Sequence, residues 1–208
     1  MEDEIINYKG YNIEIKQDKI AESPDDWGDD VLFLVGWDSR NFWIEREEFT
    51  KEIFGAYIDP DNYEDYIDEM KTIKKEYHIF GLDAYIHSGI SLSLHNEGYC
   101  CRWDTSNFIG AVFVKKTEVK TKPKAEKIAR GLIETWNDYL SGNIYGYNIE
   151  LDDGNDSCCG YYGNPDKSGL LDEAKSIINY HIKQKNKKHL AKTRAFIKNK
   201  VPLSSRIF

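Results

Sequence analysis

Hydrophobic and polar residues alternate in several short stretches of the chain, as they do in half-buried β-strands. This alternation, or a continuous apolar run of strand length, predicts strands over residues 11–16, 31–37, 84–94, 110–115 and 145–151. Gly89 interrupts the third stretch, which predicts a kink or bulge there. Asp152-Asp-Gly-Asn155 has hairpin-turn composition, so we expect residues 157–162 to return along the preceding strand.

Apolar residues at intervals of three and four predict helices over residues 46–55, 59–77 and 121–142, and a last one that begins near residue 168. Pro123 lies in the first turn of the third helix, and Gly142 closes it. Past Ile182 the apolar density falls and lysine takes over. The second half of the last helix is therefore either a projecting extension or a separate short helix.

Strands and helices follow one another without a strict β-α-β order, which favours an α+β fold. We expect a mixed, mainly antiparallel sheet flanked by helices, with a basic C-terminal helical extension. The patterns divide the chain into an acidic α+β body, residues 1–167, and a C-terminal helix with a lysine-rich tail, residues 168–208. We expect the tail from about Lys183 to be dispensable for folding of the body.

One pentapeptide occurs twice: Gly10-Tyr-Asn-Ile-Glu14 recurs as Gly146-Tyr-Asn-Ile-Glu150. The two copies are interpreted as similar strands that pair as neighbours, or as the trace of a duplication. Five residues are few, and glycine before an alternating strand is common, so a structural echo is the favoured interpretation.

Composition places the chain among compact soluble proteins. Of its 208 residues, 40% are hydrophobic and 31% are charged, and its longest strongly apolar run is far shorter than a membrane span requires. The N-terminus is acidic and lacks a signal-peptide pattern. Four cysteines are ordinary for a reduced cytosolic protein, so we expect a cytoplasmic location in the host cell.

The net charge of −8 conceals a polarity along the chain. No acidic residue follows Glu173, so the last 35 residues carry +10 and residues 1–173 carry −18. The body should repel nucleic acid and attract cationic partners, whereas the tail should do the opposite. The residues that would bind nucleic acid are Lys185, Lys187, Lys188, Lys192 and Arg194.

The predicted helix over residues 59–77 carries carboxylates at positions that imitate a row of phosphates, or that form an ordinary solvated face. Aromatic residues in acidic surroundings suggest core positions or anchors of a protein interface. The candidate partner-binding residues are Asp61, Glu64, Asp65, Asp68, Trp27, Trp43 and Tyr161.

The cysteines form two vicinal pairs, Cys100-Cys101 and Cys158-Cys159. Structural zinc sites prefer two to four intervening residues, so we expect each pair to place one thiol in the core and one at the surface, reduced and metal-free. A zinc site that takes one cysteine from each pair with His87 or His95 is an alternative, and so is a cysteine nucleophile.

His87, Asp104 and the cysteines would form an acid–base group if they met, although a histidine bonded within the fold is the more common case. The chain has no Walker loop, no G-x-G-x-x-G and no H-E-x-x-H motif, so we expect no cofactor.

Several motifs in fixed order give the chain a family resemblance. They are Gly10-Tyr-Asn-Ile-Glu14, Ala21-Glu-Ser-Pro24, Tyr85-Ile-His-Ser-Gly-Ile90, Cys101-Arg-Trp-Asp104, Tyr145-Gly-Tyr147 and Asp156-Ser-Cys158 with Gly160-Tyr-Tyr-Gly163. Over about residues 8–165 the chain resembles an uncharacterised family of small proteins of phages, plasmids and integrated elements. It departs from that family at Asp25-Asp26 and at Cys159. The family has no established activity, so the resemblance implies a genetic setting, in which proteins often modulate host defence or replication.

The main expectation is a non-enzymatic accessory protein of a phage or plasmid that binds a host or phage protein with a basic surface. It would act as an anti-defence inhibitor by occupying a nucleic-acid-binding site through acidic mimicry. The first alternative is a nucleic-acid-binding protein that acts through the basic C-terminal tail. The second is a hydrolase or metal enzyme centred on His87, Asp104 and the cysteines.

Overall fold

The computed structural model describes residues 4–38, 42–44, 71–98, 101 and 103–200. It is an α+β fold with two antiparallel sheets, and its contacts divide the chain into two compact units. Residues 20–143 form one, here called the α2 unit, and residues 1–19 with 144–208 form the other, the α3 unit. This division differs from the predicted boundary after residue 167, because the strand over residues 11–17 pairs with the strand over residues 144–151.

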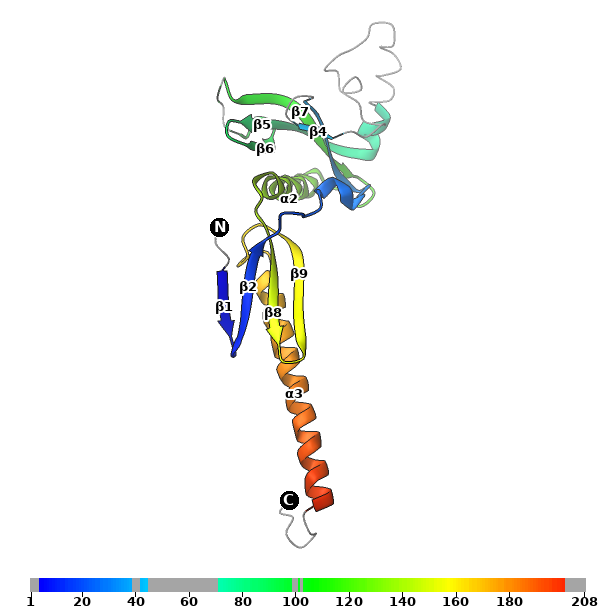
Figure 1. The fold of residues 1–208 in the computed structure, drawn as a ribbon. Coiled ribbons are helices and arrows are strands. Elements are labelled where there is room, and N and C mark those ends of the chain that lie inside the picture. Colours follow the sequence, from blue (N-terminus) through cyan, green and yellow to red (C-terminus); the bar gives the residue numbers. More distant parts are fainter. Residues whose placement is uncertain (1–3, 39–41, 45–70, 99–100, 102, 201–208) are drawn as a thin grey trace. The chain divides into compact units, whose positions relative to one another are not determined.

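The α3 unit holds a four-stranded antiparallel sheet in the order β1-β2-β8-β9, with the helix α3 on it (Figure 1). The bounds are Glu4–Tyr8 for β1, Tyr11–Gln17 for β2, Ile144–Leu151 for β8, Gly154–Tyr162 for β9 and Leu170–Lys200 for α3. Strand β1 is absent from the sequence prediction, whereas β2, β8 and the β8–β9 hairpin are confirmed.

The core of the α3 unit forms where the first turns of α3 cover the sheet. Leu170, Leu171, Ala174 and Ile178 of the helix are buried against isoleucines and tyrosines of β2 and β8. Their spacing of three and four residues places them on one side of the helix, which explains why this part packs. The helix then continues without a break beyond the strands, so the predicted tail is a projecting extension of α3 (Figure 1).

The α2 unit holds a five-stranded antiparallel sheet in the order β4-β3-β7-β5-β6. The strand bounds are Leu32–Asp38 for β3, Phe42–Ile44 for β4, Tyr77–Ile86 for β5, Ile90–Leu94 for β6 and Thr105–Lys115 for β7. The unit also contains the short 3-10 helix η1, Pro24–Trp27, and the helix α2, Lys122–Ser141. The predicted strands near residues 31–37 and 110–115 are confirmed, and β4 is new.

Helix α2 packs on one face of this sheet. Ala125 and Ala129 are fully buried and allow a close approach, and Trp136 fills the space near Phe42 with the ring centroids 5.5 Å apart. The Asn137 side chain bonds both the N–H and the carbonyl oxygen of Leu92, which ties the helix to β6. Thr121 is the N-cap residue of α2, but its side chain makes no capping hydrogen bond.

Two sequence predictions in this unit need correction. Gly89 lies in the turn between β5 and β6, so residues 84–94 are the arms of a hairpin rather than one kinked strand. Residues 71–76 are helical, as predicted, but β5 begins at Tyr77 instead of near residue 84, because pairing with β7 begins there. The predicted helix over residues 46–55 and most of the one over residues 59–77 lie outside the described residues.

No helix in the described part of the chain is long and apolar enough to cross a membrane.

Candidate functional site

A polar groove of about 280 Å³ lies between the β8–β9 turn and α3 in the α3 unit. The described residues that line it are Asp152, Asp153, His181, Gln184, Lys185, Lys188, His189 and Lys192. All but the two aspartates come from α3, at the point where the helix leaves the sheet.

Asp152 is the residue that holds this end of the sheet to the helix. Its carboxylate accepts hydrogen bonds from the Lys185 ammonium at 2.7 Å, from the Tyr11 hydroxyl at 2.8 Å and from His181 Nε2 at 3.2 Å. His181 and Lys185 are four residues apart and therefore share one side of α3. The other ring nitrogen of His181 lies 3.1 Å from an oxygen of Asp153, so the histidine bridges the two aspartates.

The charges at the turn reinforce one another. The bonds from Lys185, His181 and Tyr11 hold the pKa of Asp152 well below its usual range. In return, the carboxylate raises the pKa of Lys185 and that of the Tyr11 hydroxyl. Asp152 therefore stays ionised and Lys185 stays charged at neutral pH, and their ion pair joins the β8–β9 turn to α3.

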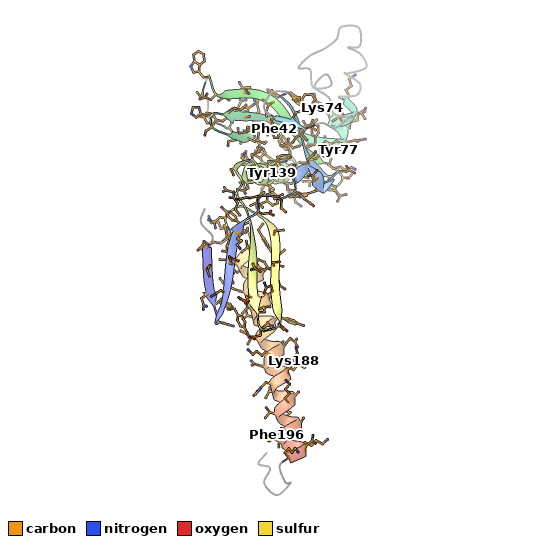
Figure 2. The ribbon with its side chains drawn as sticks, viewed as in Figure 1. Phe42, Lys74, Tyr77, Tyr139, Lys188 and Phe196 are labelled. Carbon is orange, nitrogen blue, oxygen red and sulfur yellow. The ribbon has the colours of Figure 1, made fainter. Side chains whose placement is uncertain are left out.

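Beyond this anchor lies the basic half of α3, residues 183–200. Every residue from 185 to 200 is exposed, and the segment carries eight lysine or arginine residues and no acidic one. Figure 2 labels Lys188 and Phe196 on the part of α3 that extends beyond the strands. The five predicted nucleic-acid-binding residues all lie on this segment.

Helical spacing places seven of the eight cations of the basic half of α3 in two rows, with uncharged side chains between them. Members of one row recur at intervals of four and seven residues, and those of the other at three and four. The first row is Lys183, Lys187, Arg194 and Lys198, the second is Lys185, Lys188 and Lys192, and the face between them carries Gln184, Ala191 and Ala195.

The predicted partner-binding residues lie in different parts of the chain, and only some of them are described. Asp61, Glu64, Asp65 and Asp68 lie outside the described residues. Trp27 at the end of η1 and Trp43 on β4 are exposed, both in the α2 unit.

Tyr161 has a packing role in the α3 unit. Its hydroxyl donates to Glu173 at 2.7 Å, and its ring lies 6.0 Å from that of Tyr147, so it joins β9 to α3. Burial and then Glu173 raise the pKa of Tyr161 well above its usual value, and burial raises the pKa of Tyr147 to about 12. These hydroxyls stay protonated at neutral pH.

The structure brings His87, Asp104 and Cys101 together. One carboxylate oxygen of Asp104 lies 3.5 Å from His87 Nδ1 and 3.5 Å from the Cys101 sulfur, which donates to it. A thiol that faces a carboxylate lacks the electropositive setting a thiolate nucleophile needs. Among the described residues, no group of three or more His, Cys, Asp or Glu side chains is arranged to hold a metal ion.

Cys158 and Cys159 are both exposed, which corrects the expectation of one buried and one exposed thiol. They lie on β9, an edge strand, and the register with β8 shifts between Tyr145 and Tyr147. The shift breaks the strict alternation of faces from which the expectation came.

Sequence patterns missed a buried carboxylate in the α2 unit. Asp83 is 4% exposed and accepts hydrogen bonds from the backbone N–H of Phe108 at 2.9 Å, from His95 Nδ1 at 2.9 Å and from the Asn96 N–H at 3.0 Å. Its signal was a lone acidic residue within an apolar strand, Phe80-Gly-Leu-Asp-Ala84. Its partners were not visible, because they come from two other segments.

The comparisons with known proteins give no match: no family model, no curated protein and no solved structure is similar to the chain. The resemblance to proteins of phages and plasmids therefore stays a prediction.

Proposed function

We propose that this protein binds nucleic acid through the basic half of α3. The observation that carries the proposal is one continuous helix whose residues 185–200 are all exposed and carry seven cations and no carboxylate. This segment does not contribute to the hydrophobic core of the α3 unit. Packing within the unit therefore does not account for its sequence. Lysine and arginine that neutralise phosphates supply most of the non-specific affinity for DNA.

The dimensions of the helix suit the major groove of double-stranded DNA. An α-helix with its side chains is about 10–12 Å wide, and the groove is about 12 Å wide. The segment from Lys183 to Lys200 is about 26 Å long at the rise of an α-helix. Its two cationic rows would reach the phosphates on either side of the groove, while Ala191 and Ala195 allow a close approach to the bases.

The acidic remainder of the chain opposes this binding. Residues 1–173 carry −18, which lowers affinity for any polyanion at low salt. Asp152 anchors α3 through Lys185, near the start of the basic half of the helix.

The test is fluorescence anisotropy with a labelled DNA duplex, at low and at moderate salt. Replacing Lys188, Lys192 and Arg194 by glutamine should weaken binding by about tenfold or more and should reduce the salt dependence. The matched control replaces Lys120, Lys124 and Lys127, which are also exposed, by glutamine. This control makes the same change in net charge but leaves α3 untouched.

Equal losses in the two triple variants would show that net charge, and not the basic half of α3, governs binding. Absence of binding by the unmodified protein at low salt would contradict the proposal outright.

A second candidate function is favoured by the surface around Trp27. This exposed indole ends η1, whose acidic neighbours Asp26, Asp29 and Asp30 are also exposed. Exposed tryptophan is a frequent anchor of protein interfaces. The candidate function is binding of a basic host or phage protein, as an anti-defence inhibitor that occupies its nucleic-acid site.

That second function agrees with a phage or plasmid origin and a cytoplasmic location, which we propose together with it. A competition experiment separates the two candidate functions: DNA should displace this protein from its basic protein partner. Replacing Asp61, Asp65 and Asp68 by lysine should weaken the complex with that partner, and so should replacing Trp27 by alanine. A complex that is insensitive to DNA, to both sets of substitutions and to salt would contradict acidic mimicry.

A further inference from the structure

A cavity of about 480 Å³ lies in the α2 unit, along β5 where β6 no longer pairs with it. Its volume falls within the range of small-molecule sites. The described lining residues are Trp37, Lys74, Tyr77, His78, Ile79, Gly81, Phe108, Gly110, Ala111, Lys116 and Lys122.

The charge of this cavity is opposite to that of its unit. Residues 20–143 carry a net charge of −10, yet the only ionic side chains in the described lining are Lys74, Lys116 and Lys122. Lys116 donates a hydrogen bond to the backbone carbonyl of Lys74, which holds two of these residues together. Three cations without a lining carboxylate, in an acidic unit, favour an anionic ligand.

Phe108 gives the cavity a fixed aromatic wall. Phe108 is 54% exposed, and its backbone has φ +53°, a conformation that bulky residues rarely adopt. The buried Asp83 accepts its N–H at 2.9 Å, and its carbonyl accepts the Trp37 indole N–H at 2.6 Å. His95 packs on the ring with the centroids 4.1 Å apart.

Strained backbone of this kind persists only where the surroundings hold it, and it is concentrated at functional sites. Here a buried carboxylate and an indole hold the backbone of one residue whose ring borders the cavity. Tyr77 and Trp37 are further aromatic side chains of the described lining, and Figure 2 labels Tyr77 near Lys74. Gly81 has no side chain, and a Cβ there would lie only 3.0 Å from the Phe108 ring, so the glycine lets the ring lie close to β5.

We infer that this cavity binds a small anion with a planar ring, of the chemical class of a nucleoside monophosphate. The lysines contact the phosphate, and the ring lies against Phe108 and Tyr77. This inference is independent of nucleic-acid binding by α3, which belongs to the other unit.

Isothermal titration of the full chain with AMP, GMP, CMP and UMP tests the inference, with adenosine and inorganic phosphate as partial ligands. At least one nucleotide should bind, and the nucleoside and phosphate alone should each bind at least tenfold more weakly. Replacing Lys74 or Lys122 by alanine should weaken nucleotide binding by about tenfold, the loss expected for one charge-assisted contact.

Two controls locate the effect. Lys124→Ala removes an exposed lysine of α2, the helix that also carries Lys122, and Lys124 is not among the described lining residues of the cavity. Lys188→Ala removes an exposed lysine from α3. Neither should change nucleotide affinity. Phe108→Asn keeps the backbone N–H for Asp83 and tolerates positive φ, so it should retain the fold and lose nucleotide affinity while phosphate affinity is unchanged.

Failure of all four nucleotides to bind at millimolar concentration overturns the inference. So does equal loss of affinity in Lys74→Ala, Lys122→Ala and the two lysine controls, because binding would then follow net charge alone.

Discussion

Ile13 and Ile149 lie directly opposite each other in the β2–β8 ladder, and they occupy the same position in the two copies of the repeated pentapeptide. Glu14 likewise faces Asn148, and their side chains bond at 3.3 Å. A local two-fold axis therefore passes between the two isoleucines. The prediction that the repeated segments pair as neighbours is confirmed.

This symmetry does not extend to the order of the strands in the chain. The hairpin partner of β2 precedes it, whereas the hairpin partner of β8 follows it. A tandem duplication would preserve that order. The repeat therefore reflects two central strands that face the same packing demands, which favours the structural echo.

The first prediction concerns this pair. Both isoleucines are 0% exposed, so Ile13→Ala and Ile149→Ala should each lower the free energy of unfolding by about 2–5 kcal/mol. Ile5→Ala is the matched control, because Ile5 is 63% exposed, and it should cost no more than about 0.5 kcal/mol. Urea unfolding measures all three.

The double variant gives a further check. Since the two side chains are direct cross-strand neighbours, their effects should deviate from additivity by about 0.5 kcal/mol or more. Strict additivity would contradict the register.

Alternation predicted β2, whose buried residues Ile13 and Ile15 lie on one face of the strand. The edge strand β1 was missed, because an edge tolerates an exposed residue such as Ile5 and its pattern is then irregular. The start of β5 at Tyr77 was missed for another reason. Tyr77 continues the helical spacing, and only pairing with β7 assigns it to a strand.

The candidate sites were less predictable than the strands that carry them. The lysine tail was evident from composition, but its anchor was not, because Tyr11 and Asp152 meet only through the pairing of β2 with β8. The cavity beside Phe108 depends on a positive φ and on where β6 stops. Neither feature leaves a pattern in the local sequence.

The second prediction concerns Asp83. Its burial raises its pKa, but the bonds from the Phe108 N–H, His95 and the Asn96 N–H outweigh that effect and lower it. Asp83→Asn should therefore cost about 1–3 kcal/mol at pH 7, because the amide cannot accept all of these bonds. Glu118→Gln, an exposed change in the same unit, should cost little.

The pH dependence has a definite sign. The contribution of Asp83 is complete above its unfolded pKa of about 3.9 and is lost as the pH falls through the lowered folded value. The stability gap between the unmodified protein and Asp83→Asn should thus narrow below about pH 4. Urea unfolding at several pH values measures it, and a gap that widens in acid would be inconsistent with the network.

The third prediction contrasts two glycines of the α2 unit. A Cβ at Gly110 would overlap the Val35 carbonyl oxygen, because β7 lies against β3 there, so Gly110→Ala should destabilise by about 1–3 kcal/mol. Gly131 lies in α2 with open space around it, and Gly131→Ala should stabilise by about 0.5–1 kcal/mol. Thermal unfolding should show a lower melting temperature for Gly110→Ala and a higher one for Gly131→Ala. Shifts of the same sign would contradict either the close contact at Gly110 or the open space at Gly131.

The fourth prediction is that deletion of residues 184–208 leaves the fold intact. Within the described part of this segment, Leu190, Phe196 and Ile197 are exposed, so little apolar burial is lost. The deletion does remove Lys185 from Asp152, but an ion pair this exposed contributes little to stability. The melting temperature should therefore fall by no more than about 2–4 °C, the range that a small loss of stability gives in a chain of this size. Ile178→Ala, on the buried turns of the same helix, should lower the free energy of unfolding by about 2–5 kcal/mol and serves as the contrast.

A deletion that lowers the melting temperature by tens of degrees would contradict this prediction. It would mean that the basic half of α3 packs into a core, and that helix segment would then be unavailable for the DNA groove.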